Sequence, residues 1–183
     1  LSTGRVRPME LGIDLKSIER VHISACGTAY YAGLVGKYWI ERYARIPVEI
    51  DIASEFRYRE PPLQKGGLAI FVSQSGETAD TLATLRYCKS QGQRIASIVN
   101  VRTSTIARES DVVLPTLAGP EIGVASTKAF TCQLSVMACL AIGLARARGA
   151  ISAKDEAELV QALAEIPRHI STLLQNEEQY EQL

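Results

Sequence analysis

The chain alternates short apolar runs with longer segments of helical periodicity. Val- and Ile-rich runs predict strands at residues 21–24, 48–52, 68–72 and 95–99, with a weaker strand at 112–114 that Pro115 ends. Most of these runs show no clear polar alternation, which is typical of strands covered on both faces. The second run is the exception, because Glu49 and Asp51 alternate with apolar residues, and this pattern favours a strand at a sheet edge.

The segments between these strands predict helices. Apolar positions at helical spacing favour helices at residues 28–45, 78–91 and 126–148, with a short helical turn at 105–109. A final amphipathic helix is expected after Ser152, where Asp155 stands three residues on as a capping partner. Pro167 is expected to break this helix, which would resume as a polar tail over residues 168–183.

Strands that alternate with helices predict an α/β fold, a doubly wound parallel sheet of five strands. We expect the flavodoxin-like strand order 2-1-3-4-5, which places the second strand at an edge and the loops after strands one and three where the strand order reverses. Residues 20–150 form the predicted domain. Residues 1–19 are a lead-in segment, and residues 151–183 are a C-terminal helical extension.

Composition narrows the class of protein. Among 183 residues, 20 basic and 20 acidic side chains cancel, so nucleic acid and anionic membranes are poor partner candidates. No apolar stretch approaches the roughly 20 residues that a bilayer span requires. The four cysteines form no CxxC pair and have no accompanying His cluster. We therefore expect no metal site and a reduced, cytoplasmic protein.

A polar loop follows the third predicted strand. It reads Ser73-Gln74-Ser75-Gly76-Glu77-Thr78 and leads into a predicted helix, whose N-terminus offers unpaired backbone N–H groups to a phosphate. Its hydroxyls and amide add uncharged donors, and Gly76 permits close approach of a ligand. The loop lacks both the P-loop lysine and GxGxxG, so it suits a phosphomonoester rather than a nucleotide cofactor, and no cofactor is expected. The plainer interpretation is that Ser75 or Thr78 only caps the helix.

Two further loops are expected at the same end of the sheet. They are Ala25-Cys26-Gly27-Thr28, after the first strand, and residues 118–128, after the fifth. Because ligands of open α/β sheets bind beyond the carboxyl ends of the strands, the loops after strands one and three are expected to share a pocket. In the third loop, Ser126 and Thr127 are expected to cap the long helix. The alternative is that the backbone of this loop faces the ligand.

The order and spacing of three motifs resemble the isomerase half of glucosamine-6-phosphate synthases, also called isomerising glutamine–fructose-6-phosphate aminotransferases. The motifs are Ser-Ala-Cys-Gly-Thr, Phe-Val-Ser-Gln-Ser-Gly-Glu-Thr-Ala-Asp-Thr and Glu-Ile-Gly-Val-Ala-Ser-Thr-Lys-Ala-Phe-Thr. The middle motif alone indicates only a sugar isomerase (SIS) domain, whereas the third is more specific. The resemblance extends over nearly the whole chain.

The resemblance implies that this is the first of two SIS domains, and that it binds fructose 6-phosphate or glucosamine 6-phosphate. The implied phosphate-binding residues are Ser73, Gln74, Ser75 and Thr78. Thr28, the Val124 backbone and Ser126 are implied to lie against the sugar. The family's glutaminase domain and second SIS domain are the implied partners outside this chain, and a homodimer is expected.

No catalytic residue is assigned to this chain. The resemblance places the catalytic glutamate, lysine and histidine in the second SIS domain, so we expect the isolated chain to bind the phosphosugar weakly without turnover. His22 and His169 lie outside the predicted loops. Glu77 is expected to brace a neighbouring segment, because a carboxylate that faces a phosphate would repel it. Two alternatives stay open: a non-catalytic phosphosugar-sensing SIS module, and a structural role in which helix 126–148 forms a dimer surface.

Overall fold

The computed structural model describes residues 4–7, 10–122 and 126–175. In chain order the elements are β1 (Val21–Ala25), α1 (Gly27–Trp39), the π-helical η1 (Ile40–Ala44), β2 (Val48–Ile52), α2 (Ala53–Arg59), β3 (Leu68–Ser73), α3 (Ala79–Ser90), β4 (Arg94–Val99), α4 (Thr105–Glu109), β5 (Val112–Pro115), α5 (Lys128–Ala147) and α6 (Ala153–Leu174). All strand pairs are parallel and the order is β2-β1-β3-β4-β5, so the predicted fold class and strand order are confirmed.

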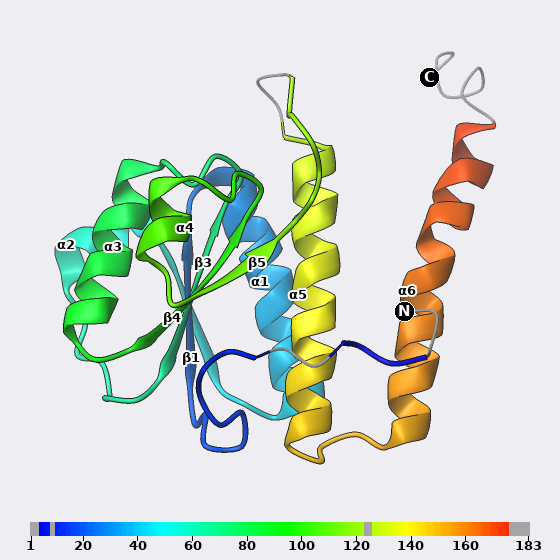
Figure 1. Ribbon diagram of the computed structural model, residues 1–183, viewed down its shortest axis with the longest axis horizontal. Coiled ribbons are helices and arrows are strands. Elements are labelled where there is room, and N and C mark those ends of the chain that lie inside the picture. The colour runs from blue at the N-terminus through cyan, green and yellow to red at the C-terminus, as the bar shows by residue number, and fades with distance from the viewer. Residues whose placement is uncertain (1–3, 8–9, 123–125, 176–183) are drawn as a thin grey trace.

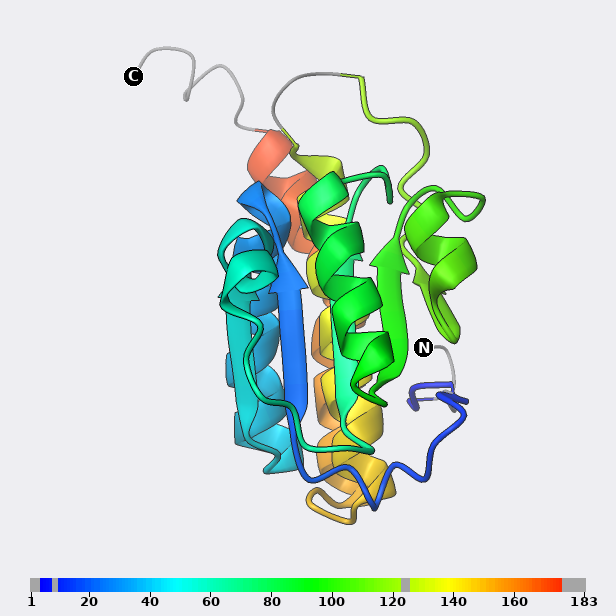
Figure 2. The same cartoon turned by 90° about the vertical axis from the view of Figure 1, so that its left-hand side faces the viewer.

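The sheet is the middle layer of the fold. Figures 1 and 2 show α1 and α5 on one face, α2, α3 and α4 on the other, and α6 outside α5. Successive strand residues point to opposite faces of the sheet, so each apolar run contributes side chains to a hydrophobic core on each face. Ile23 and Ile70 pack with Met137 on the α1–α5 side, and Phe71 packs with Leu85 on the α3 side. Burial on both faces explains why β1 and β3 carry apolar runs without alternation.

Two helices differ from the expectation. The sequence pattern did not predict α2, a helix of 7 residues that is anchored by the buried Phe56. Helices this short depend on tertiary packing for their stability, so local periodicity is a weak signal. The predicted break at Pro167 is wrong, because α6 continues through that residue to Leu174. Pro167 itself is exposed, and it removes only one helical hydrogen bond, the one to the carbonyl of the half-buried Leu163.

The long helix α5 also corrects an expectation about apolar length. It has 20 residues and a mean hydropathy of 1.5 in its most apolar window, which is long and apolar enough for a membrane span by composition alone. In this fold, half of that window (50%) is buried. The buried side chains include Met137, Leu140 and Leu144, which belong to the core on that side of the sheet. A core helix of a globular domain accounts for this pattern.

Candidate functional site

The candidate site lies at the carboxyl ends of the strands. Because all the strands are parallel, the loops after β1, β3, β4 and β5 gather at one end of the sheet, the upper end in Figure 1. The strand order places β1 beside β3 and reverses between them. This is the point at which an open α/β sheet leaves a crevice for a ligand.

The loop after β3, residues 73–78, is called the phosphate loop below. Ser73 is buried, and its Oγ accepts a hydrogen bond from the Gly76 N–H at 3.0 Å and lies 3.3 Å from Thr78 Oγ1. Ser75 is exposed, and its Oγ accepts a hydrogen bond from the Glu77 N–H at 3.2 Å. Gln74 is half-buried. The residues that were predicted to hold phosphate therefore form one tight turn.

The N-terminus of α3 is open. Thr78 is its N-cap residue, yet no side chain makes a capping hydrogen bond there, so the interpretation of Ser75 or Thr78 as a simple cap is wrong. The N–H groups of the first turn have no acceptor within the helix, which leaves a site for an anion at the positive end of the helix dipole. Asp80 is the acidic residue of this turn, and Arg57 offsets its charge at 3.1 Å.

The phosphate loop packs against the segment that begins α4. Gly76 has φ +67, and a Cβ on it would lie 2.0 Å from Ser104 Oγ. Its carbonyl accepts a hydrogen bond from the Ile106 N–H at 3.0 Å. The carboxylate of Glu77 accepts one from the Thr105 N–H at 2.7 Å, which confirms its predicted bracing role. This backbone hydrogen bond lowers the pKa of Glu77, so the carboxylate is ionised at neutral pH.

The sugar-facing candidates lie on two other elements. Thr28 is exposed in the first turn of α1, directly after β1 and the half-buried Cys26. Ser126 is half-buried, and its Oγ is fully buried with no hydrogen-bond partner among the described residues. Val124 lies outside the described residues. An unpartnered buried hydroxyl is costly, so the Ser126 Oγ favours a hydrogen-bond partner that the described residues do not supply.

The predicted capping of α5 by Ser126 and Thr127 is wrong. Thr127 is the N-cap residue, but its side chain makes no capping hydrogen bond. Glu121 occupies this helix N-terminus instead, and its carboxylate accepts hydrogen bonds from the N–H groups of Ala129 at 2.9 Å and Thr127 at 3.4 Å. A negative charge is favourable at that end of a helix. The Ser126 hydroxyl is therefore not committed to capping.

Asn100 is a site residue that the sequence analysis missed. It follows the last residue of β4 and contacts both the phosphate loop and the loop after β5. A polar side chain immediately after a buried parallel strand, at the end of the sheet where ligands bind, is the signal that could have identified it. The loops predicted to bind a ligand were those after the first, third and fifth strands, and Asn100 lies in the loop after the fourth.

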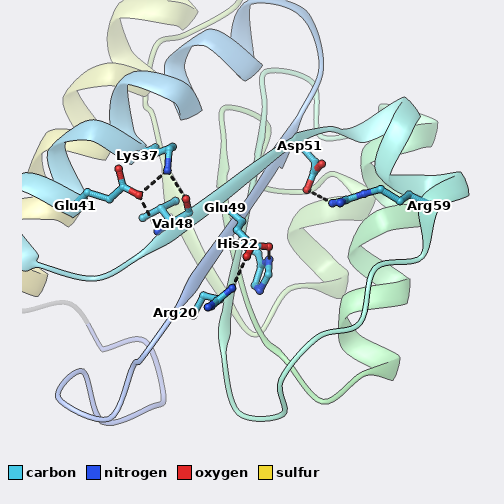
Figure 3. Close-up of polar contacts among 8 residues, drawn as sticks. All are labelled: Arg20, His22, Lys37, Glu41, Val48, Glu49, Asp51 and Arg59. Carbon is cyan, nitrogen blue, oxygen red and sulfur yellow. Dashed lines mark hydrogen bonds and ion pairs between the residues drawn. The ribbon is translucent and has the colours of Figure 1, made fainter.

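The histidines do not lie at these loops. Figure 3 shows His22 directed toward Glu49, beside Arg20, and its Nδ1 lies 3.5 Å from Glu49 Oε2. Burial lowers the pKa of His22 from its ordinary 6.5, although Glu49 acts in the opposite direction. His169 is exposed on α6. Within the part of the chain that the structure describes, no group of three or more His, Cys, Asp or Glu residues could hold a metal ion.

Comparison with protein families and curated proteins adds independent evidence. The family model of the SIS domain matches residues 14–143. The isomerising glutamine–fructose-6-phosphate aminotransferase of Brucella abortus is 68% identical over 178 residues, which are 97% of this chain and 29% of that protein. The protein of the same name from Bradyrhizobium diazoefficiens is 65% identical over an alignment of 184 positions, which covers 100% of this chain and 30% of that protein. The chain thus spans less than a third of these relatives.

Solved structures agree in fold. The C-terminal domain of glucosamine-fructose-6-phosphate aminotransferase from Francisella tularensis matches with a TM-score of 0.94 and 39% identity, covering 100% of this chain and 52% of that chain. Glucosamine-6-phosphate deaminase from Thermotoga maritima matches with a TM-score of 0.68 and 28% identity, covering 85% of this chain and 47% of that chain. In both cases the matched region is about half of the solved chain.

Proposed function

This chain belongs to the SIS domain family, and from its 65% and 68% identity to the relatives above we propose that it is the first SIS domain of an isomerising glutamine–fructose-6-phosphate aminotransferase. Its role is to bind fructose 6-phosphate and the product, glucosamine 6-phosphate. Residues 20–150 form the binding domain, and residues 151–183 lead toward a second SIS domain. The proposal includes the partners implied by the resemblance: a glutaminase domain, the second SIS domain and a second copy of the chain, in a cytoplasmic enzyme.

The open N-terminus of α3 carries this proposal. The hydroxyl-bearing residues Ser73, Ser75 and Thr78 precede its first turn directly in the sequence, and the phosphate loop itself contains no cationic side chain. A phosphate held by dipoles and neutral donors is bound without a permanent ion pair, which suits a substrate that must also leave. The Ser73 and Thr78 hydroxyls, 3.3 Å apart, can both rotate to donate to one phosphate oxygen.

The phosphate group sets the direction in which the sugar extends. A phosphate seated on α3 leaves the sugar to extend past the carboxyl end of β1 toward the N-termini of α1 and α5, where Thr28 and Ser126 lie. The buried Ser126 Oγ then pairs with a sugar hydroxyl rather than remaining unpartnered. Binding energy collected at the phosphate, away from the reacting carbon, can be used to position that carbon for chemistry.

The chemistry itself needs a free general base, and the loop carboxylates among the described residues, Glu77 and Glu121, are already engaged by backbone N–H groups. Isomerisation of a ketose requires a general base at the substrate carbon. The carboxylate on the phosphate loop is that of Glu77, which accepts a hydrogen bond from the Thr105 N–H at 2.7 Å. His22 lies on β1 beside Glu49, near the opposite end of the strand from the loop. We therefore expect the isolated chain to bind the phosphosugar without turning it over.

Calorimetric titration of the chain with fructose 6-phosphate tests the proposal, with fructose as a control that lacks the anion and inorganic phosphate as a control that lacks the sugar. The variant Ser75→Trp places a bulky side chain at the exposed rim of the phosphate loop. Its matched control is Ser90→Trp, which makes the same change at an exposed residue at the other end of α3.

The expected result is saturable binding of fructose 6-phosphate by the chain and by Ser90→Trp, with no detectable binding by a folded Ser75→Trp. Fructose alone should not bind measurably. Absence of binding by the unmodified chain, or undiminished binding by Ser75→Trp, would contradict the proposed site. Formation of glucosamine 6-phosphate by the chain alone would contradict the assignment of catalysis to the second domain.

A further inference from the structure

Asn100 connects two loops of the candidate site that are distant in sequence. Its backbone N–H donates a hydrogen bond to the Gln74 carbonyl of the phosphate loop at 3.2 Å. Its side-chain Oδ1 accepts hydrogen bonds from Ala118 N at 2.9 Å and from Thr116 Oγ1 at 3.1 Å. Its Nδ2 donates to the Gly119 carbonyl at 2.6 Å. The Asn100 side chain therefore contacts three residues of the loop after β5, while its own backbone N–H is bonded to the phosphate loop.

The loop held by Asn100 has an unfavourable backbone. Leu117 has φ 56 and Gly119 has φ 69, so left-handed residues flank Ala118 on both sides. The left-handed region costs energy for Leu, and its side chain is 76% exposed, so burial does not compensate. Such conformations persist where the surrounding contacts enforce them. The Asn100 side chain supplies three hydrogen bonds on either side of Leu117, and the Thr116 N–H adds one to the Val99 carbonyl at 3.0 Å.

The same loop is anchored at its far end. Glu121 binds the N-terminus of α5 through the N–H groups of Thr127 and Ala129. Ser126, whose buried hydroxyl is proposed to meet the sugar, immediately precedes that helix end. A chain of contacts therefore runs from the phosphate loop through Asn100 and Glu121 to the position of Ser126.

We propose that Asn100 is a positioning residue, which sets residues 116–121 after β5, and through Glu121 the N-terminus of α5, relative to the phosphate loop and so makes the site select a phosphosugar over inorganic phosphate. This inference rests on the proposed function and deepens it. Asn100 acts through the loops and does not itself bind the substrate. The phosphate loop keeps its other supports without the Asn100 side chain, because Glu77 and Gly76 bond to the start of α4 independently.

The chemistry of the contacts calls for an amide. Aspartate at position 100 would keep the acceptor for Thr116 and Ala118 but would place a carboxylate oxygen against the Gly119 carbonyl, where Asn100 now donates. It would also add a negative charge beside a bound phosphate. Alanine would remove all three side-chain hydrogen bonds. Both variants should therefore impair the orientation of the loop, although they have different charges.

The test compares two ligands on the same 183-residue chain. The dissociation constant of fructose 6-phosphate is measured by calorimetry, and that of inorganic phosphate by phosphorus NMR line broadening. For Asn100→Ala we expect a rise of about ten-fold or more for fructose 6-phosphate, the scale of one to two lost hydrogen bonds, and no change for inorganic phosphate. Ser90→Ala is the matched control, because it removes an exposed polar contact at the far end of α3, and it should change neither value.

Thr116→Val is a milder second variant, because it removes only the hydroxyl that donates to Asn100 Oδ1. It should weaken fructose 6-phosphate binding by a smaller factor and should add nothing when combined with Asn100→Ala. If both ligands weaken equally in Asn100→Ala, or neither does, the positioning role is refuted while the proposed function stands. If the unmodified chain binds neither ligand, the proposed function fails, and this inference fails with it.

Discussion

Replacing Gly76 by alanine is the most direct test of how the phosphate loop is built. Gly76 has φ +67, and its added Cβ would lie 2.0 Å from Ser104 Oγ and 2.5 Å from Ser104 Cβ. Rotation of the Ser104 hydroxyl can relieve the first contact but not the second, because the Cβ is fixed to a buried backbone. The loop must therefore move or the start of α4 must shift.

The expected loss of stability in Gly76→Ala has two parts. A left-handed conformation costs an L-residue about 1–2 kcal/mol, and overpacking a tight contact costs about 1–3 kcal/mol. We therefore expect Gly76→Ala to lower the free energy of unfolding by about 2–5 kcal/mol. Gly149→Ala separates the parts, because Gly149 has φ +70 but no atom within 4 Å of the added Cβ. That control should show only the backbone cost.

Urea-induced unfolding followed by circular dichroism gives both values. The double variant Gly76→Ala/Ser104→Gly removes the side chain that the new methyl group meets, so it should lose less stability than the sum of the two single variants, by about 1–3 kcal/mol. Equal losses for Gly76→Ala and Gly149→Ala, or strict additivity in the double variant, would refute the packing argument. Fructose 6-phosphate binding should weaken in Gly76→Ala and stay unchanged in Gly149→Ala.

Two further predictions concern pH and capping. Burial lowers the pKa of His22 below its unfolded value of 6.5, so between these two pKa values the unfolded chain binds more protons than the folded chain. The free energy of unfolding should therefore fall as the pH decreases through 6.5. His22→Gln should reduce this pH dependence in denaturation measured between about pH 7 and about pH 5.5. The exposed control His169→Gln should leave it unchanged. An equally steep decline in His22→Gln, or the same reduction in His169→Gln, would contradict the role of His22. Ser152 Oγ accepts a hydrogen bond from Asp155 N at 3.1 Å in a capping box at the start of α6. Ser152→Ala should therefore lower the free energy of unfolding by about 1 kcal/mol, and Ser152→Gly by only a few tenths. Equal urea midpoints for the two variants would contradict the capping role of Ser152.

Regular elements with strong local patterns were predictable from the sequence. The predicted strands and those of the structure agree within one residue at each end, and β2 lies at the sheet edge that its alternating Glu49 and Asp51 had indicated. Burial on one or both faces of a strand determines which consecutive residues are apolar, so the position of a strand can be predicted from residues that are neighbours in the sequence. The capping box at Ser152 and Asp155 is local in the same way.

The candidate site was only partly predictable. The phosphate loop was visible because its hydroxyls, amide and glycine are contiguous between a strand and a helix. Whether Thr78 uses its hydroxyl for capping was not visible, because that choice depends on Ser73, which the fold of the loop brings to 3.3 Å. The resemblance named residues that the phosphate loop alone does not contain, such as Thr28 and Ser126.

The sequence by itself determined the strands, most of the helices and the position of the phosphate loop, because each depends on residues that are neighbours along the chain. Tertiary structure alone decided which groups support the loops. Thr105 N–H meets Glu77 across 28 positions, and Ala118 N–H meets Asn100 across 18. The capping of α5 by Glu121 and the existence of α2 were decided in the same way. Such contacts arise only when the parallel strands bring their carboxyl ends together, so no local pattern records them.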